Sequence, residues 1–134
     1  MVEFAVVLPL ILVLITGMVA FSLMLNTYLV LSHATDVGAR NLALSRGATT
    51  DPCADAVAAI QSSAPNLTPS SLTYSFTIGS GSFASPSTSC TAGEADMVAG
   101  SEARVTVTYP FQLLFYGWKP TTVNITASTS EVIQ

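Results

Sequence analysis

The chain has 134 residues, a net charge of −4 and only four basic residues. Nucleic-acid binding requires clustered lysine and arginine, so the composition excludes this class of function. Half of the residues are hydrophobic and only 9% are charged, well below the roughly 25% that is usual in soluble domains. We therefore expect lipid, copies of the same chain or hydroxyl-bearing side chains to cover much of the surface.

The chain opens with a long apolar segment, Phe4–Leu31, that contains no charged residue. It exceeds the roughly 20 residues needed to span a bilayer and the roughly 7 to 15 apolar residues of a secretory signal. On the N-terminal side of this segment the charged residue is Glu3, and the first basic residue of the chain is Arg40. Membrane anchors usually carry lysine or arginine on the cytoplasmic side. We therefore interpret the numbered chain as a mature product from which a basic leader has been removed.

Glu3 has two interpretations. A carboxylate in lipid is costly unless it is paired, and the α-amine at Met1 of a neighbouring copy is a suitable partner. Alternatively, Glu3 lies in the headgroup region and is solvated. Further along, Pro9 removes a helix hydrogen bond and Gly17 permits close approach of another helix. Both are also ordinary residues of membrane helices.

The pattern predicts one helix from about residue 3 to 46, which stops at Gly47. Beyond Ser32 the helix becomes amphipathic, and Asp36 and Arg40 have the spacing of an ion pair. The spacing predicts one apolar stripe, formed by Val30, Ala34, Val37, Asn41 and Leu44.

The remaining residues predict a short helix and a small sheet. Asp51 is placed to cap a helix that starts at Pro52 and ends before Pro65. Alternating apolar residues predict strands over residues 71–78, 102–109 and 122–133, with Pro110 ending the second. Residues 79–100 have the composition of a loop. We expect an α+β, pilin-like fold in which a long N-terminal stem helix (residues 1–47) packs on a small antiparallel sheet within an extracytoplasmic head domain (residues 48–134).

The two cysteines, Cys53 and Cys90, both lie outside the apolar segment. A domain that is moved across a membrane normally oxidises such a pair. The link would stabilise the fold by about 4 kcal/mol on the chain-entropy model. The alternative is two unpaired buried thiols.

Catalytic and metal-binding patterns are weak, and we expect no enzyme activity, no cofactor and no metal. The only histidine, His33, could be grouped with Ser32 and Asp36, but they lie on the stem helix without a pocket. A calcium site could form only if the head loops brought several carboxylates together, and no ligand spacing supports it. Those carboxylates are Asp51, Asp55, Glu94 and Asp96.

Aromatic residues gather in the segment 111–120. For a small domain we expect Phe111 and Phe115 to belong to the core. We expect Tyr116 and Trp118 to form a subunit contact.

The string "VEFAVVLPLILVLITGMVAFSLMLN" resembles the start of TadE/TadG-like pseudopilins, in which an acid–aromatic pair, here Glu3 and Phe4, opens an apolar helix and "VLP" follows. The segments "ATDVGARNLALSRG", "ARVTVTYPFQLLF" and "VNITASTSEVI" resemble later parts of the family in the same order. The acid stands at residue 3, earlier than is usual in this superfamily, and Met1 could equally be an initiator. Either the cleavage site differs or the numbering does not begin at the mature N-terminus, which leaves the partner of Glu3 open. The resemblance implies a leader removed by a prepilin peptidase and a role in a Tad-type pilus.

We therefore predict a structural subunit of a type IV pilus-like filament that polymerises through its N-terminal helices. It would be held in the inner membrane as a precursor, drawn out by a pilus assembly platform and displayed outside the cell. The subunit contacts would involve Met1, Glu3, Phe4, Pro9, Gly17, Tyr116 and Trp118. Two alternatives remain, namely a minor pseudopilin that primes assembly and a membrane-anchored extracytoplasmic binding module.

Overall fold

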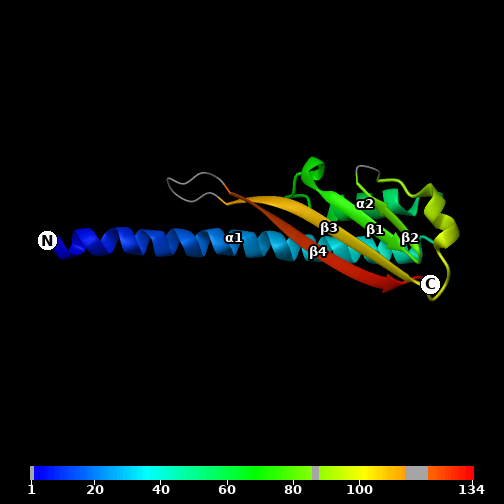
Figure 1. Cartoon of the computed structure of the whole chain (residues 1–134), viewed down its shortest axis with the longest axis horizontal. Coiled ribbons are helices and arrows are strands. Elements are labelled where there is room, and N and C mark those ends of the chain that lie inside the picture. The colour runs from blue at the N-terminus through cyan, green and yellow to red at the C-terminus, as the bar shows by residue number, and fades with distance from the viewer. Residues whose placement is uncertain (1, 86–87, 114–120) are drawn as a thin grey trace.

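A computed structural model describes residues 2–85, 88–113 and 121–134. For residues 2–6, 92 and 94 it describes the backbone but not the side chains. The molecule is elongated (Figure 1). One helix runs along its whole length, and the N-terminal end of this helix projects beyond all other elements. The sheet and the second helix surround the other end.

The long helix, α1, extends from Val2 to Leu44 without interruption and passes through Pro9. This confirms the predicted helix to within two residues at its C-terminal end. Its 43 residues correspond to a length of about 65 Å at 1.5 Å per residue.

The sheet contains four antiparallel strands in the order β2-β1-β3-β4. Their bounds are β1 Thr73–Ile78, β2 Gly81–Ala84, β3 Glu102–Leu113 and β4 Thr121–Val132. β3 and β4 form a long two-stranded ribbon, paired from Glu102 opposite Val132 to Leu113 opposite Thr121. The predicted α+β fold with a stem helix on a small antiparallel sheet is confirmed.

Two details of the sheet differ from the prediction. Strand β2 lies in the glycine- and serine-rich stretch that was expected to be loop, where it pairs with β1 across a turn at Gly79, whose φ is +55°. In addition, β3 continues through Pro110 instead of ending there. Proline is tolerated because β1 pairs with β3 only as far as Thr108. One edge of β3 therefore has no neighbouring strand at Pro110, and a missing N–H is acceptable there.

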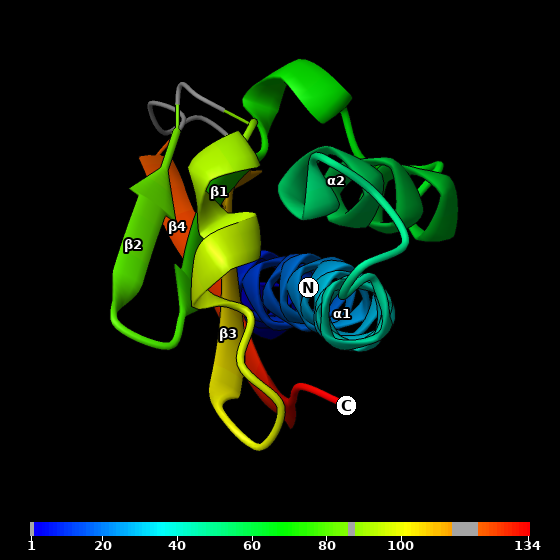
Figure 2. The same cartoon turned by 90° about the vertical axis from the view of Figure 1, so that its right-hand side faces the viewer.

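The core lies where α1 meets the inner face of the sheet and the second helix. This helix, α2, extends from Pro52 to Ser63, and Figure 2 shows it beside the end of α1, with the sheet on another side. The alternating strand residues face inward as predicted. The largest fully buried side chains include Leu31, Leu42, Ile60, Phe76, Ile78, Val105, Val107 and Ile133.

The apolar stripe predicted on α1 is largely wrong. Asn41 and Leu44 are exposed, and of the predicted residues only Ala34 is fully buried. Two partners, the sheet and α2, cover the helix over a wider arc than one stripe. The buried residues of this part are Leu31, Ala34, Thr35, Gly38, Ala39, Leu42, Ala43 and Ser45.

Candidate functional site

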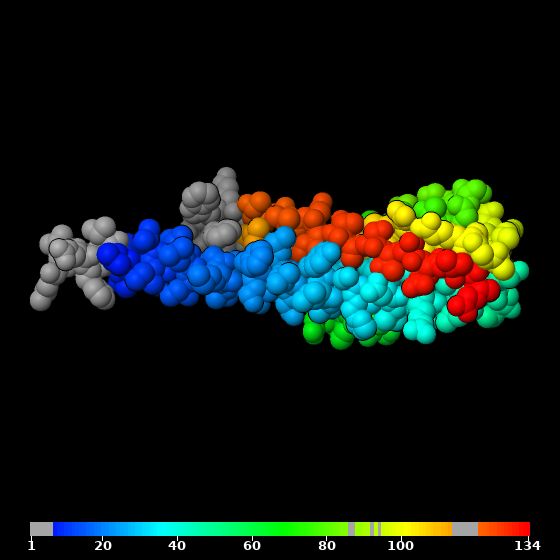
Figure 3. Space-filling view, turned by 90° about the horizontal axis from the view of Figure 1, so that it is seen from below, coloured from blue at the N-terminus to red at the C-terminus, as the bar shows by residue number. Residues whose placement is uncertain are grey.

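The N-terminal half of α1 is the most unusual surface of the molecule. We call residues 7–29 of α1 the exposed stem. Its large apolar side chains are mostly exposed, for example Leu10 at 65%, Met18 at 70% and Phe21 at 66%. Figure 3 shows the N-terminal part of the exposed stem extending past the strands, whereas its later part lies beside them. By length and composition, α1 can cross a membrane. An apolar surface of this size requires a cover of lipid or protein.

Two threonines of the exposed stem satisfy their hydroxyl donors within the helix, whereas Ser22 and Asn26 are exposed polar residues of the same stem. The Thr16 hydroxyl donates to the carbonyl oxygen of Leu12 at 2.9 Å, and the Thr27 hydroxyl donates to that of Leu23 at 3.0 Å. These donors are therefore satisfied within the helix, as an apolar environment requires. No charged residue occurs between Glu3 and Asp36.

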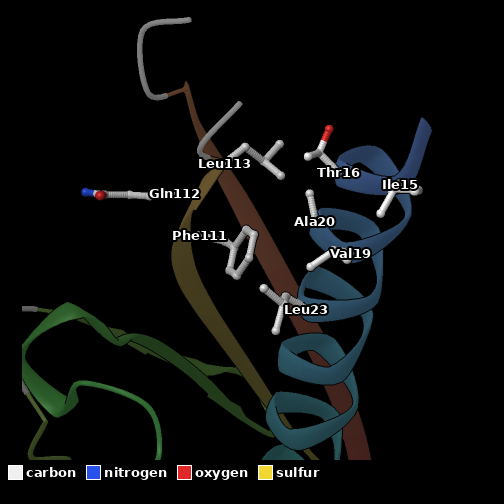
Figure 4. Close-up of a pocket in the computed structure, with 8 residues that line it drawn as sticks. All are labelled: Ile15, Thr16, Val19, Ala20, Leu23, Phe111, Gln112 and Leu113. Carbon is white, nitrogen blue, oxygen red and sulfur yellow. The ribbon is translucent and has the colours of Figure 1, made fainter. Parts of the chain in front are cut away.

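A groove separates the exposed stem from the end of the ribbon. Its volume is about 300 Å³, and it is lined by Ile15, Thr16, Val19, Ala20, Leu23, Phe111, Gln112 and Leu113. In Figure 4 the side chains of Phe111 and Leu113 point toward the helix, whereas Gln112 points away from it. Phe111, expected in the core, packs against the edge of the core but is only half buried, because the ribbon does not close onto the helix here.

A second groove lies between α1 and β4. It has a volume of about 260 Å³ and is lined by Phe21, Met24, Leu25, Tyr28, Ile125 and Thr126. Among the described side chains of α1, the first that is fully buried is that of Leu31. The head thus packs tightly on α1 only from this residue onward. Sequence reasoning missed both grooves, although the continuation of the alternating strand into Phe111 and Leu113 was an available signal.

At the opposite end of the molecule, a disulfide bond joins Cys53 of α2 to Cys90, with their Cα atoms 5.5 Å apart. This confirms the predicted pairing. The carboxylate of Asp51 caps α2 by accepting from the Ala54 N–H at 3.2 Å, and it also accepts from the Cys90 N–H at 3.0 Å. Partial burial alone would raise the pKa of Asp51. Hydrogen bonds from Ser89, Cys90 and the start of α2 outweigh it and lower this pKa below its ordinary value.

Several of the candidate polar groups serve structural contacts in the described part of the chain, and the Glu94 side chain lies outside it. Within the described residues, no three metal-binding side chains come together. The Asp51 carboxylate is instead used by the helix cap. On the stem, Asp36 was expected to pair with Arg40, but it accepts a hydrogen bond from the Thr129 hydroxyl of β4. In the described part of the chain, an ion pair instead joins Arg104 to Glu102, with a nitrogen–oxygen distance of 3.1 Å.

The predicted subunit-contact residues fall into two groups. Pro9 and Gly17 lie on the exposed stem, and a methyl group added at Gly17 would meet no atom within 4 Å. The backbone of Glu3 and Phe4 belongs to α1, but their side chains lie outside the described part. So do the residues Met1, Phe115, Tyr116 and Trp118 in full.

Comparison with known proteins yields one family. Residues 1–40 match the family described as TadE-like protein. No curated protein and no solved structure matches the chain. The matched range covers the exposed stem and ends within the part of α1 that packs in the head. It confirms the resemblance over these residues, and this family implies a pilin-like protein associated with a Tad pilus, structural rather than catalytic.

Proposed function

We propose that this chain, which over residues 1–40 belongs to the TadE-like protein family, is a structural subunit of a Tad-type extracellular filament. Residues 1–47 act as the stem that polymerises, and residues 48–134 form the extracytoplasmic head. A prepilin peptidase processes the precursor in the inner membrane, and an assembly platform extracts it into the filament.

The observation that carries the proposal is the exposed stem. Most of its large apolar side chains are left exposed by the described residues, whereas one side of the same helix is buried in the head from Leu31 onward. In the membrane, lipid covers the stem. Lipid tails are as apolar as leucine, so exchanging lipid for other helices is driven by close packing rather than by the hydrophobic effect.

Close packing between stems is supported by Gly17. This residue lies on the exposed stem with open space around its Cα atom, where the backbone of a neighbouring helix can approach closely. We include Pro9 and Phe4 in the same contact between copies, and Tyr116 and Trp118 in a second contact.

Glu3 sets the register between subunits in this proposal. Its carboxylate pairs with the α-amine at Met1 of a neighbouring copy, because an unpaired carboxylate among apolar helices costs several kcal/mol. The absence of any other charge before Asp36 means that a misaligned stem cannot satisfy this carboxylate from another side chain of the apolar segment.

Electron microscopy of sheared cell-surface material with antibody labelling tests the proposal. We expect label along the whole length of regular fibres. Label confined to fibre ends would indicate a minor subunit that primes assembly, and material without labelled fibres would indicate a membrane-anchored binding module.

The register role of Glu3 is tested separately with Glu3→Gln. The matched control is Glu131→Gln, which changes an exposed carboxylate on β4, far along the chain from the stem. We expect Glu3→Gln to reduce the yield of sheared fibres strongly at an unchanged amount of membrane-held precursor. Equal fibre yields from the two variants would refute the pairing.

A further inference from the structure

We propose that, before assembly, the end of the β3–β4 ribbon enters the outer leaflet of the membrane and that lipid acyl chains occupy the groove beside the stem. We define the ribbon end as residues 111–113 and 121–123. This inference rests on the proposed function, in which the unassembled subunit is held in the membrane. It adds a second contact with lipid, besides that of the helix.

The positions of residues along α1 carry the argument. A bilayer core of about 30 Å takes about 20 helical residues at 1.5 Å each. The earliest boundary that charge permits is Glu3, so a span that begins there ends near residue 23. Ile15, Val19 and Leu23 lie within the outer half of this span, and they line the groove opposite Phe111 and Leu113.

Other placements of the span increase the overlap. A later start shifts the outer boundary further along α1, toward Tyr28 and the second groove. A tilted helix needs more residues to cross the same thickness. The overlap between the ribbon end and the outer leaflet is therefore smallest when the span begins at Glu3, and even then it covers about 12 Å of helix length.

The charge distribution along the ribbon agrees with this position. The charged residues within β3 and β4, Glu102, Arg104 and Glu131, all lie at the end remote from the exposed stem; Lys119, in the segment that joins the two strands, lies outside the described residues. From Val105 to Leu113 and from Thr121 to Ser130 the two strands contain no charged residue. The part of the ribbon that lies beside the stem is thus the part that lipid can tolerate.

The ribbon end also has two faces of different character. Phe111 is paired with Val123, and both are half buried on the side of the groove. Gln112 is paired with Thr122, and both are exposed. Phe111 and Leu113 contact acyl chains, while Gln112 remains hydrated at the headgroups.

The unpaired backbone groups along the ribbon edges limit the depth. Such groups are costly in the hydrocarbon core, so the ribbon end stays at the boundary between headgroups and acyl chains. The bilayer thins locally around it, at a cost of fractions of a kcal/mol per Å.

Tryptophan fluorescence in vesicles tests this contact. The full chain contains a single tryptophan, Trp118, which is replaced by phenylalanine so that one new tryptophan reports at each chosen site. The test variant is Trp118→Phe with Leu113→Trp. The matched control is Trp118→Phe with Val98→Trp, because Val98 is exposed in the loop before β3. A third variant, Trp118→Phe with Gln112→Trp, reports on the opposite face of the ribbon.

The full chain is reconstituted as unassembled protein in phosphatidylcholine vesicles with or without bromine on the acyl chains. We expect the tryptophan at position 113 to emit at shorter wavelength and to lose most of its fluorescence to the bromine. The tryptophan at position 98 should be unaffected, and the one at position 112 should be quenched much less than that at 113. A second reporter, Phe111→Trp in the Trp118→Phe background, should behave like position 113 and guards against a local packing fault.

Two results would overturn the inference. Quenching at positions 111 and 113 no greater than at position 98 would place the ribbon in water. Quenching at position 113 that disappears as the protein-to-lipid ratio rises would assign the groove to a second copy of the chain. Fibre formation is scored independently, so fibres without quenching refute this contact alone, whereas quenching without fibres refutes the filament and keeps the lipid contact.

Discussion

The two halves of α1 belong to one continuous helix but have opposite environments. The half up to residue 29 carries the larger and more apolar side chains and is exposed. The half from Leu31 to Leu44 is rich in small residues, and one side of it is buried against the sheet and α2. Burial within the chain therefore does not follow hydrophobicity along this helix. It follows the fit between surfaces, and the most apolar part of the helix stays mostly exposed.

Small residues make the burial of the second half possible. A methyl group added at Gly38 would approach side-chain atoms of Ile60 in α2 to 2.4 and 2.6 Å. The buried hydroxyl of Thr35 donates to the Leu31 carbonyl oxygen at 2.7 Å, so it needs no partner from another element. The two helices can then approach closely without an unsatisfied polar group.

The largest difference between the buried and the exposed part of the molecule is expected from the disulfide bond, which should affect the stability of the head but not the stem. Replacing both Cys53 and Cys90 by serine should lower the free energy of unfolding of the head by about 4 kcal/mol, because the bond closes a long loop in the unfolded chain. Urea unfolding in mild detergent measures this change. Membrane insertion of the stem should stay unchanged, and an unaltered unfolding midpoint would contradict the assigned role.

The next contrast is between two leucines of the same helix. Leu42→Ala removes a side chain that is 0% exposed and should cost about 3 kcal/mol of stability. Leu14→Ala removes one that is 55% exposed and should leave the unfolding of the head unchanged while lowering the yield of fibres. Equal stability losses in the two variants would show that the exposed stem packs within the chain.

The two glycines give a sharper and smaller contrast. Gly38→Ala should lower stability by about 1 to 3 kcal/mol, because the new methyl group overlaps the Ile60 side chain. Gly17→Ala meets no atom and should strengthen the helix by up to about 1 kcal/mol. For the yield of fibres we expect the opposite order, with a larger reduction from Gly17→Ala than from Gly38→Ala. Thermal unfolding in detergent measures the two stabilities, and the amount of fibres sheared from cells measures the two fibre yields.

The smallest effect concerns the cap of α2. Asp51→Ala should cost about 1 kcal/mol through the lost cap, and the Cys90 N–H also loses its partner. Because the pKa of the ionised Asp51 is lowered in the folded state, its stabilisation is complete above the ordinary value of 3.8 and is lost as pH falls through the folded-state pKa. The variant should therefore lose less stability than the parent chain between pH 5 and pH 2, roughly the window of carboxylate titration. Parallel pH profiles would contradict this role for Asp51.

Several features were predictable because they depend on short-range patterns. The uncharged opening predicted the long helix, Asp51 followed by Pro52 predicted the start of α2, and strict alternation identified the inward faces of three strands. Strand β2 was missed because its glycine and serine residues have low strand propensity, and its formation depends on pairing with β1. The extension of β3 through Pro110 was missed because only the sheet order shows that this edge is free.

The amino-acid sequence by itself determined that an uncharged helix of membrane-spanning length opens the chain and that an antiparallel head with two cysteines follows. Periodicity, capping residues and the distribution of charge are local and can be read directly. Only the tertiary structure decided which arc of α1 is buried and that the ribbon returns along the stem to form a groove beside Ile15–Leu23. These features arise from contacts between segments far apart in the chain, and the shapes of both surfaces determine them together.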